Sequence, residues 1–179
     1  ANNLTKALRS DSKKQGNWGE IILERVLERS GLNKGSEYVI QYSDRNQEGD
    51  LIRPDVIVNL PENKHIIIDS KVSLVAYDAY VNELDDNKKE QHLKSHIDSI
   101  KDHVKNLSQK NYQEAPTLDT PDFVLLFLPV ESAFSIAIQH EPSLFNLAWD
   151  KKIVIVSPTT LLATLKTVAS IWRRSEERR

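Results

Sequence analysis

The apolar residues of the N-terminal third follow first a helical spacing and then short β-branched runs. Between Asn17 and Gly31 they recur every three or four residues, which predicts a helix that ends at the glycine. Three later runs predict strands, over residues 38–42, 53–59 and 65–72. The Pro-Glu-Asn-Lys sequence at 61–64 is typical of a turn, so the second and third strands should pair as a hairpin.

The central part of the chain predicts two consecutive helices. Ser73 is a suitable N-cap for a helix that reaches Leu84, and a charged break follows at residues 85–87. The next helix carries a narrow apolar stripe at spacings of four, three, four and three residues, formed by Leu93, Ile97, Ile100, Val104 and Leu107. Such a stripe indicates packing against one neighbour, in this chain or in another, so a homo-oligomer formed through this helix is one hypothesis.

The C-terminal part alternates strands with helices. Residues 123–128 are all apolar, as expected for a strand that is covered on both faces, and residues 152–156 predict a further strand. Helical stretches are expected near 132–139 and 142–149, and Ser157-Pro158 should open a last helix from Thr159 to about Arg174. This order of elements predicts an α/β fold with a mixed central sheet flanked by helices.

Length and composition fit a single domain. The 179 residues are 39% apolar, and we expect one domain over residues 16–174, preceded by the tail of a helix or a linker at 1–15 and followed by a polar tail at 175–179. The chain has no cysteine, which excludes disulfides and thiolate–metal sites and fits a reducing compartment. It has no methionine either, even at position 1, so we expect a piece of a longer chain.

The charge excludes a protein that merely coats nucleic acid. The 24 basic residues are balanced by 26 acidic ones, for a formal net charge of −2. Any contact with DNA must therefore come from a local patch, and the acidic surplus suits chemistry assisted by a metal ion.

Two acidic residues and a lysine interrupt the paired strands. Asp55 lies near the start of one strand, and Asp69, Ser70 and Lys71 follow the apolar residues of the next. Because strand side chains alternate between faces, Asp69 and Lys71 should share one side and Ser70 the other. Charges near a core are costly unless a partner compensates them. We therefore expect Asp55 and Asp69 to bind a divalent cation such as Mg²⁺.

The same residues would support hydrolysis of a phosphodiester. Lys71 would lie beside the attacked phosphate and stabilise its developing charge. The carbonyl of Ser70 would be a further ligand, and Glu20 would bind the metal directly or through water. Against this, an Asp-x-Lys triplet also occurs by chance at strand ends, and a lone acid such as Glu20 often complements a helix dipole. The second acid, Asp55, at hairpin distance favours the catalytic interpretation.

Other residues are weaker candidates for a functional site. Thr159 and Thr160, with Lys166 two turns further on, would meet a DNA phosphate at the start of the last helix, and simple capping is the alternative. His92 and His96 lie four residues apart but lack the intervening glutamate of a zinc protease, so we expect them to be solvated. The five glycines form no phosphate-binding loop, and we expect no small-molecule cofactor.

Five blocks, in order along the chain, resemble the RmuC family of bacterial DNA recombination proteins. They are Gly16–Glu20, Arg53–Ile57, Ile68–Val72, Pro121–Val124 and Ser157–Ala163, and the similarity extends from about Lys14 to Arg174. The resemblance implies a restriction-endonuclease-like core of the PD-(D/E)xK superfamily. In that pattern Asp55 is the carboxylate after proline, Asp69 and Lys71 form the D-x-K pair, and Glu20 is the helix acid.

The resemblance also implies a function and a location. It implies a nuclease that depends on Mg²⁺ or Mn²⁺, with DNA as its partner, acting in recombination or rearrangement. It places the protein on the cytoplasmic side of a bacterial cell, where family members commonly carry an N-terminal membrane anchor and a coiled coil that this chain does not contain. The alternative is a catalytically silent module that keeps the nuclease fold and binds DNA structures or scaffolds recombination proteins.

Overall fold

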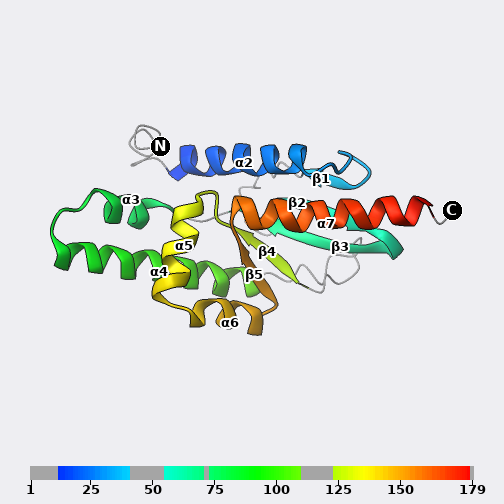
Figure 1. Cartoon of the computed structure of the whole chain (residues 1–179). Helices are drawn as coiled ribbons and strands as arrows, with labels where there is room; N and C mark the ends of the chain where they lie inside the picture. Colours follow the sequence, from blue (N-terminus) through cyan, green and yellow to red (C-terminus); the bar gives the residue numbers. More distant parts are fainter. Residues whose placement is uncertain (1–11, 41–54, 71–72, 110–122, 178–179) are drawn as a thin grey trace, which may run out of the picture.

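A computed structural model describes residues 12–40, 55–70, 73–109 and 123–177, and within these ranges five strands form one mixed sheet (Figure 1). The strands are β1 (Tyr38–Ile40), β2 (Val56–Leu60), β3 (Lys64–Asp69), β4 (Val124–Phe127) and β5 (Ile153–Val156), and they lie in this order across the sheet. The first three pair antiparallel, and β3, β4 and β5 pair parallel. The predicted α/β class and the mixed sheet are confirmed.

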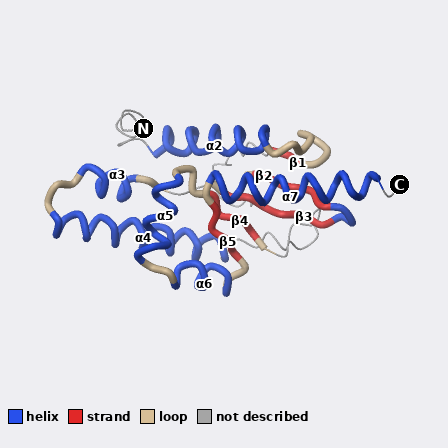
Figure 2. Tube along the Cα trace, in the orientation of Figure 1, coloured by secondary structure: helices blue, strands red, loops and turns tan. Residues whose placement is uncertain are grey.

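Helices cover both faces of the sheet (Figure 2). One face packs against α2 (Ser12–Arg29) and α7 (Pro158–Glu177). The other face packs against α4 (Asp86–Ser108), α5 (Glu131–His140) and α6 (Ser143–Asp150), and the short α3 (Val75–Asn82) lies along α4. The two parallel connections, from β3 to β4 and from β4 to β5, therefore run through the same helical layer.

Strand β4 shows why a continuous apolar run is needed at the centre of this fold. Leu125 and Phe127 point into the core beneath α2 and α7, whereas Leu126, and Leu128 directly after the strand, join the core beneath α4, α5 and α6. All four side chains are at most 1% exposed. The prediction of a strand covered on both faces is confirmed.

The apolar stripe of α4 is buried within this single chain. Its five residues are between 0% and 7% exposed and pack in one cluster with Ile67 of β3 and Leu126 of β4. The stripe pattern allowed packing against this chain or against another chain, and in this structure the stripe packs against the sheet of its own chain. The stripe therefore holds α4 on the sheet.

The β2–β3 hairpin has the predicted turn and register. A 3-10 turn, η1 (Pro61–Asn63), joins the strands, with Glu62 and Asn63 at φ values of 70° and 61°. Val56 pairs with Ile68 and Leu60 with Lys64. Helix α7 also contacts the hairpin, because the Trp172 Nε1–H donates a hydrogen bond of 2.9 Å to the carbonyl of Asn59 in β2. The hairpin is thus fixed to the helical layer.

Some element ends differ from the sequence prediction. Helix α2 starts at Ser12, inside the predicted tail, and ends as expected before Gly31, which has a φ of 87°. Helix α7 continues to Glu177, beyond the predicted end at Arg174, and so includes a polar last turn that the apolar periodicity did not mark. The predictions for 53–54, 71–72 and the loop 111–121 lie outside the described residues. None of the helices in the described ranges is both long and apolar enough to cross a membrane.

Candidate active site

The two predicted acidic residues lie at the same end of the β2–β3 hairpin. Asp55 directly precedes β2, and Asp69 is the last residue of β3. Since Val56 pairs with Ile68, the next position outward brings Asp55 opposite Asp69. Both residues are buried, at 5% and 1% exposure. The hairpin register therefore places two acids side by side in the protein interior.

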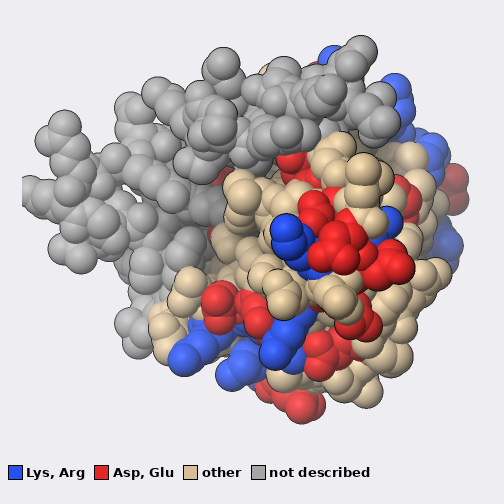
Figure 3. All heavy atoms as spheres, turned by 90° about the vertical axis from the view of Figure 1, so that its left-hand side faces the viewer, with Lys and Arg blue, Asp and Glu red and all other residues tan. Residues whose placement is uncertain are grey.

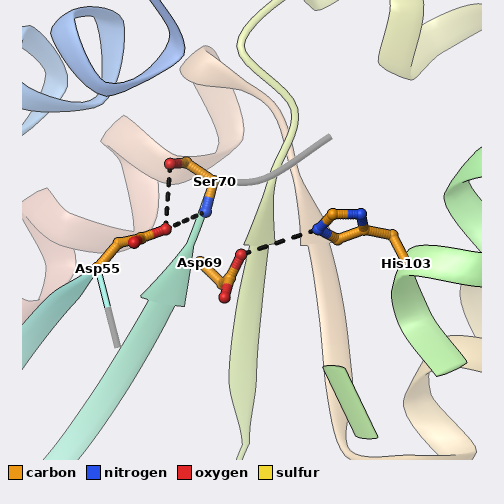
Figure 4. A network of polar contacts seen from close by, with 4 residues as sticks. All are labelled: Asp55, Asp69, Ser70 and His103. Atoms are coloured by element: carbon orange, nitrogen blue, oxygen red, sulfur yellow. Dashed lines mark hydrogen bonds and ion pairs between the residues drawn. The ribbon is translucent and has the colours of Figure 1, made fainter. Parts of the chain in front are cut away.

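Ser70 binds Asp55 through two of its groups (Figure 4). Asp55 Oδ2 accepts hydrogen bonds from the Ser70 backbone N–H at 3.0 Å and from the Ser70 hydroxyl at 3.3 Å. Asp69 points away from this pair, toward α4, as strand alternation predicts. Both the hydroxyl and the backbone N–H of Ser70 therefore bind and orient the Asp55 carboxylate.

The environment of Asp55 disfavours the ionised carboxylate relative to water. Burial raises its pKa to about 6 from an ordinary value of 3.8, and the negative charges of Asp69 and Glu20 add to this effect. The two hydrogen bonds from Ser70 act in the opposite direction and lower the pKa. The net result is a buried acid whose ionised form lacks sufficient compensating charge.

Glu20 reaches the site from the opposite helical layer. It lines a pocket beside Asp55 whose other walls are mainly apolar, formed by Leu23, Leu27, Ile40 and Val56 together with Glu24. Helix α2 lies close to the strand end at the preceding residue, since a Cβ at Gly19 would be 3.9 Å from the Ser70 carbonyl oxygen. The exposed Glu20 therefore stands at the rim of the site, where its charge acts on Asp55.

A histidine that sequence reasoning missed faces Asp69. His103 of α4 places Nε2 at 3.9 Å from Asp69 Oδ1 (Figure 4). His103 immediately precedes Val104 of the buried stripe and lies two helical turns after His96, so both histidines follow the phase of that stripe. This phase was the available signal, and it indicates side chains that face the sheet.

The expectation that His96 is solvated is wrong. His96 is fully buried, its Nε2 lies 2.9 Å from the Ala133 carbonyl oxygen, and its ring packs against Tyr77. Within the described part of the chain, His96 Nδ1 has no hydrogen-bond partner. Burial lowers the pKa of His96, although the contact with Ala133 opposes this. The absence of a metal motif did not imply exposure, because the helix face decides burial.

The predicted DNA-contacting residues of the last helix lie at the same edge of the sheet as the acids. Thr159 donates through its N–H and its hydroxyl to the Glu131 carboxylate, at 3.2 and 2.8 Å. Thr160 and Ser157 cap the helix reciprocally through their hydroxyls and N–H groups. Lys166 is exposed two turns further along α7. Capping thus occupies both threonines, while their contact with DNA stays a prediction.

Two further observations bear on metal and DNA binding. Lys71 lies outside the described residues, and within the described ranges no group of three or more His, Cys, Asp and Glu side chains is arranged to bind a metal ion. In the face shown in Figure 3, acidic and basic side chains are interspersed over the part of the surface that is described. Among the described residues on that face, the Lys and Arg side chains therefore form no continuous basic patch.

The fold and site together define an α/β domain with a buried pair of acids at the end of its central hairpin. A sequence model of the RmuC family matches residues 1–179, and the chain belongs to that family. The predicted resemblance is confirmed.

Several curated relatives are similar over nearly the whole chain. The DNA recombination protein RmuC homolog of Pseudomonas aeruginosa is 52% identical over 177 residues, which cover 99% of this chain and 39% of the relative. The DNA recombination protein RmuC of Escherichia coli K12 is 49% identical, covering 99% and 37%. The homolog of Vibrio cholerae is 47% identical, covering 98% and 34%. The chain thus spans little more than a third of each relative. No solved structure matches it.

Proposed function

We propose that this chain is the core of a metal-dependent DNA nuclease that hydrolyses phosphodiesters during DNA recombination. The observation that carries the proposal is the position of Asp55 and Asp69, two buried acids opposite each other at the end of β2 and β3. Such a pair is costly in the interior unless a cation compensates it. A PD-(D/E)xK arrangement accounts for this placement, with Glu20 as the acid contributed by a helix.

The donor set fits a hard divalent cation. Burial, and after it the negative charges of Asp69 and Glu20, raise the pKa of Asp55, and a cation beside these acids would offset both effects. Carboxylate and carbonyl oxygens are the ligands that Mg²⁺ and Mn²⁺ prefer. Asp55, Asp69 and the carbonyl of Ser70 would hold the ion, and Glu20 would contribute directly or through water. When bound, such an ion polarises a phosphate oxygen and lowers the pKa of a water molecule.

The other residues of the chain would orient the substrate and the carboxylates. Ser70 fixes Asp55 through its backbone N–H, which keeps one carboxylate oxygen in a defined position. Lys71, the next residue in sequence, would lie beside the scissile phosphate and stabilise the charge that develops on it. Thr159, Thr160 and Lys166 would contact the DNA backbone along α7.

The names of the relatives support the biological setting of this proposal. Because the relatives are named DNA recombination proteins, we infer DNA as the partner and recombination or rearrangement as the process. Because the relatives are bacterial and DNA is the inferred partner, we also propose the cytoplasmic side of a bacterial cell as its location.

The test is cleavage of duplex, single-stranded and branched DNA in the presence of Mg²⁺ or Mn²⁺. Asp55→Asn, Asp69→Asn and Lys71→Ala should each reduce cleavage by about a hundredfold or more. Asp98→Asn, which changes an exposed aspartate of α4, is the matched control and should retain full activity. Cleavage that persists in all three site variants would show that a different site, or a contaminating nuclease, is responsible.

One observation favours a second candidate function. Since Asp69 is directed toward His103 of α4 and Asp55 toward Ser70, the domain would also suit a silent nuclease fold that binds DNA structures or scaffolds other proteins. In that case the chain would bind branched DNA with an affinity that falls as salt rises, and no metal would produce turnover. Asp55→Asn and Asp69→Asn would then leave the affinity for DNA unchanged.

A further inference from the structure

His103 connects the helical layer to the buried acid pair. Its side chain is 26% exposed, while that of Asp69 is 1% exposed, and the separation of 3.9 Å between Nε2 and Oδ1 is the reach of an ion pair (Figure 4). We propose that His103 is a positioning residue, which orients the Asp69 carboxylate for binding of a divalent cation. This inference rests on the proposed function, because it assigns a role within the same site.

The position of His103 on its helix supports a specific role. The residue lies between Ile100 and Leu107 on the side of α4 that faces the sheet, where apolar residues form the core. A polar side chain at such a position costs free energy unless it has a polar partner. Asp69 provides that partner, at the end of the strand over which this part of α4 packs.

The chemistry of the pair explains how His103 would act on the metal site. The His103 ring stands at ion-pair distance, 3.9 Å, from Oδ1 of Asp69, so it borders one carboxylate oxygen and leaves the second for a cation. When protonated, the ring would form an ion pair with Asp69 and hold its carboxylate on the side of α4. Groups that hold metal ligands in place in this way typically change metal affinity by about 10- to 100-fold when they are removed.

The experiment is a calorimetric titration of the 179-residue chain with Mg²⁺ and with Mn²⁺, at one fixed pH and without DNA. His103→Leu should weaken the binding of both metals by roughly tenfold, and His103→Gln, which retains an N–H donor, should stay within about threefold of the wild type. His92→Asn, which changes a half-buried histidine three turns away on the same helix, should bind both metals as the wild type does. If His103→Leu unfolds, the comparison of His103→Gln with a truncating His103→Ala replaces it.

The outcomes separate this inference from the proposed function. If Asp69→Asn loses metal binding while His103→Leu and His103→Ala bind both metals as tightly as the wild type, the positioning role is refuted and the metal site stands. If the His103 variants lose Mn²⁺ but keep Mg²⁺, His103 is itself a ligand, and the positioning role is again refuted. If the wild type binds neither metal, or Asp69→Asn binds as the wild type does, the proposed metal site fails and the inference fails with it.

Discussion

Replacing Asp55 by asparagine should stabilise the metal-free protein at neutral and alkaline pH. Because the pKa of Asp55 is raised from 3.8 to about 6, the folded state binds a proton more tightly than the unfolded state. Any stabilisation from this proton is fully present below about pH 4 and is lost as the pH rises through about 6. At about pH 8 the ionised Asp55 is therefore a cost to the folded protein.

The size of that cost follows from the pKa. A tenfold change in an equilibrium constant corresponds to about 1.4 kcal/mol, so the rise from 3.8 to about 6 corresponds to about 3 kcal/mol for this buried group. Asparagine retains an acceptor for the Ser70 N–H, but a hydrogen bond to a neutral acceptor is weaker by about 1 kcal/mol. We expect a net gain of about 1–2 kcal/mol, or about 2–8 °C in Tm for a chain of this size.

The measurement is urea and thermal unfolding in a chelating buffer at about pH 8 and about pH 4.5, comparing wild type with Asp55→Asn. The gain should be present at the higher pH and absent at the lower, and Asp98→Asn should show neither effect. With metal added at about a hundred times its Kd, the wild type should gain about 2.7 kcal/mol and Asp55→Asn much less. An Asp55→Asn protein that is no more stable than wild type at about pH 8 would refute the reasoning.

Three further predictions concern the layers around the site. Burial lowers the pKa of His96, so the stability it provides should be complete above about pH 6.5 and fall as the pH decreases; His96→Gln should flatten this dependence in urea unfolding between about pH 5 and 8. Ile100 is fully buried in the α4 stripe, and Ile100→Ala should cost about 2–5 kcal/mol in the same assay. An unchanged midpoint would contradict this packing. Glu131 accepts two hydrogen bonds from Thr159, so Glu131→Gln should lower the free energy of unfolding by about 0.5–1 kcal/mol. A Tm equal to that of the wild type in thermal unfolding would contradict this.

Those parts of the fold that depend on local periodicity could be predicted from the sequence. The continuous apolar run of β4 identified a strand covered on both faces, because only such a strand needs apolar side chains at every position. The turn at 61–64 fixed the hairpin register, and with it the position of Asp55 opposite Asp69. Since these two acids are close in sequence and in paired strands, their proximity follows from local rules.

Contacts between layers could not be predicted in the same way. The phase of the α4 stripe indicates that His96 and His103 face inward, but their partners, the Ala133 carbonyl and Asp69, come from other elements and are known only from the packing of the layers. Likewise, the contact of Thr159 with Glu131 joins residues on different helices, so the spacing of residues within α7 contains no sign of it. Tertiary packing decided these positions, and it also reversed the expectation for His96.

The position of Glu20 depends on a contact between layers, that of helix α2 with the sheet. Helix α2 approaches the strand end at Gly19, where a Cβ would stand 3.6 Å from Pro129 Cγ and 3.9 Å from the Ser70 carbonyl oxygen. These are ordinary van der Waals distances, so a methyl group fits there, but a larger side chain would push α2 away from the sheet. Glu20 would move with the helix, while Asp55 and Asp69 would keep their places in the hairpin. The site therefore has two acids fixed by strand register and a third fixed by the fit of a helix, and only the third can be shifted without disturbing the sheet.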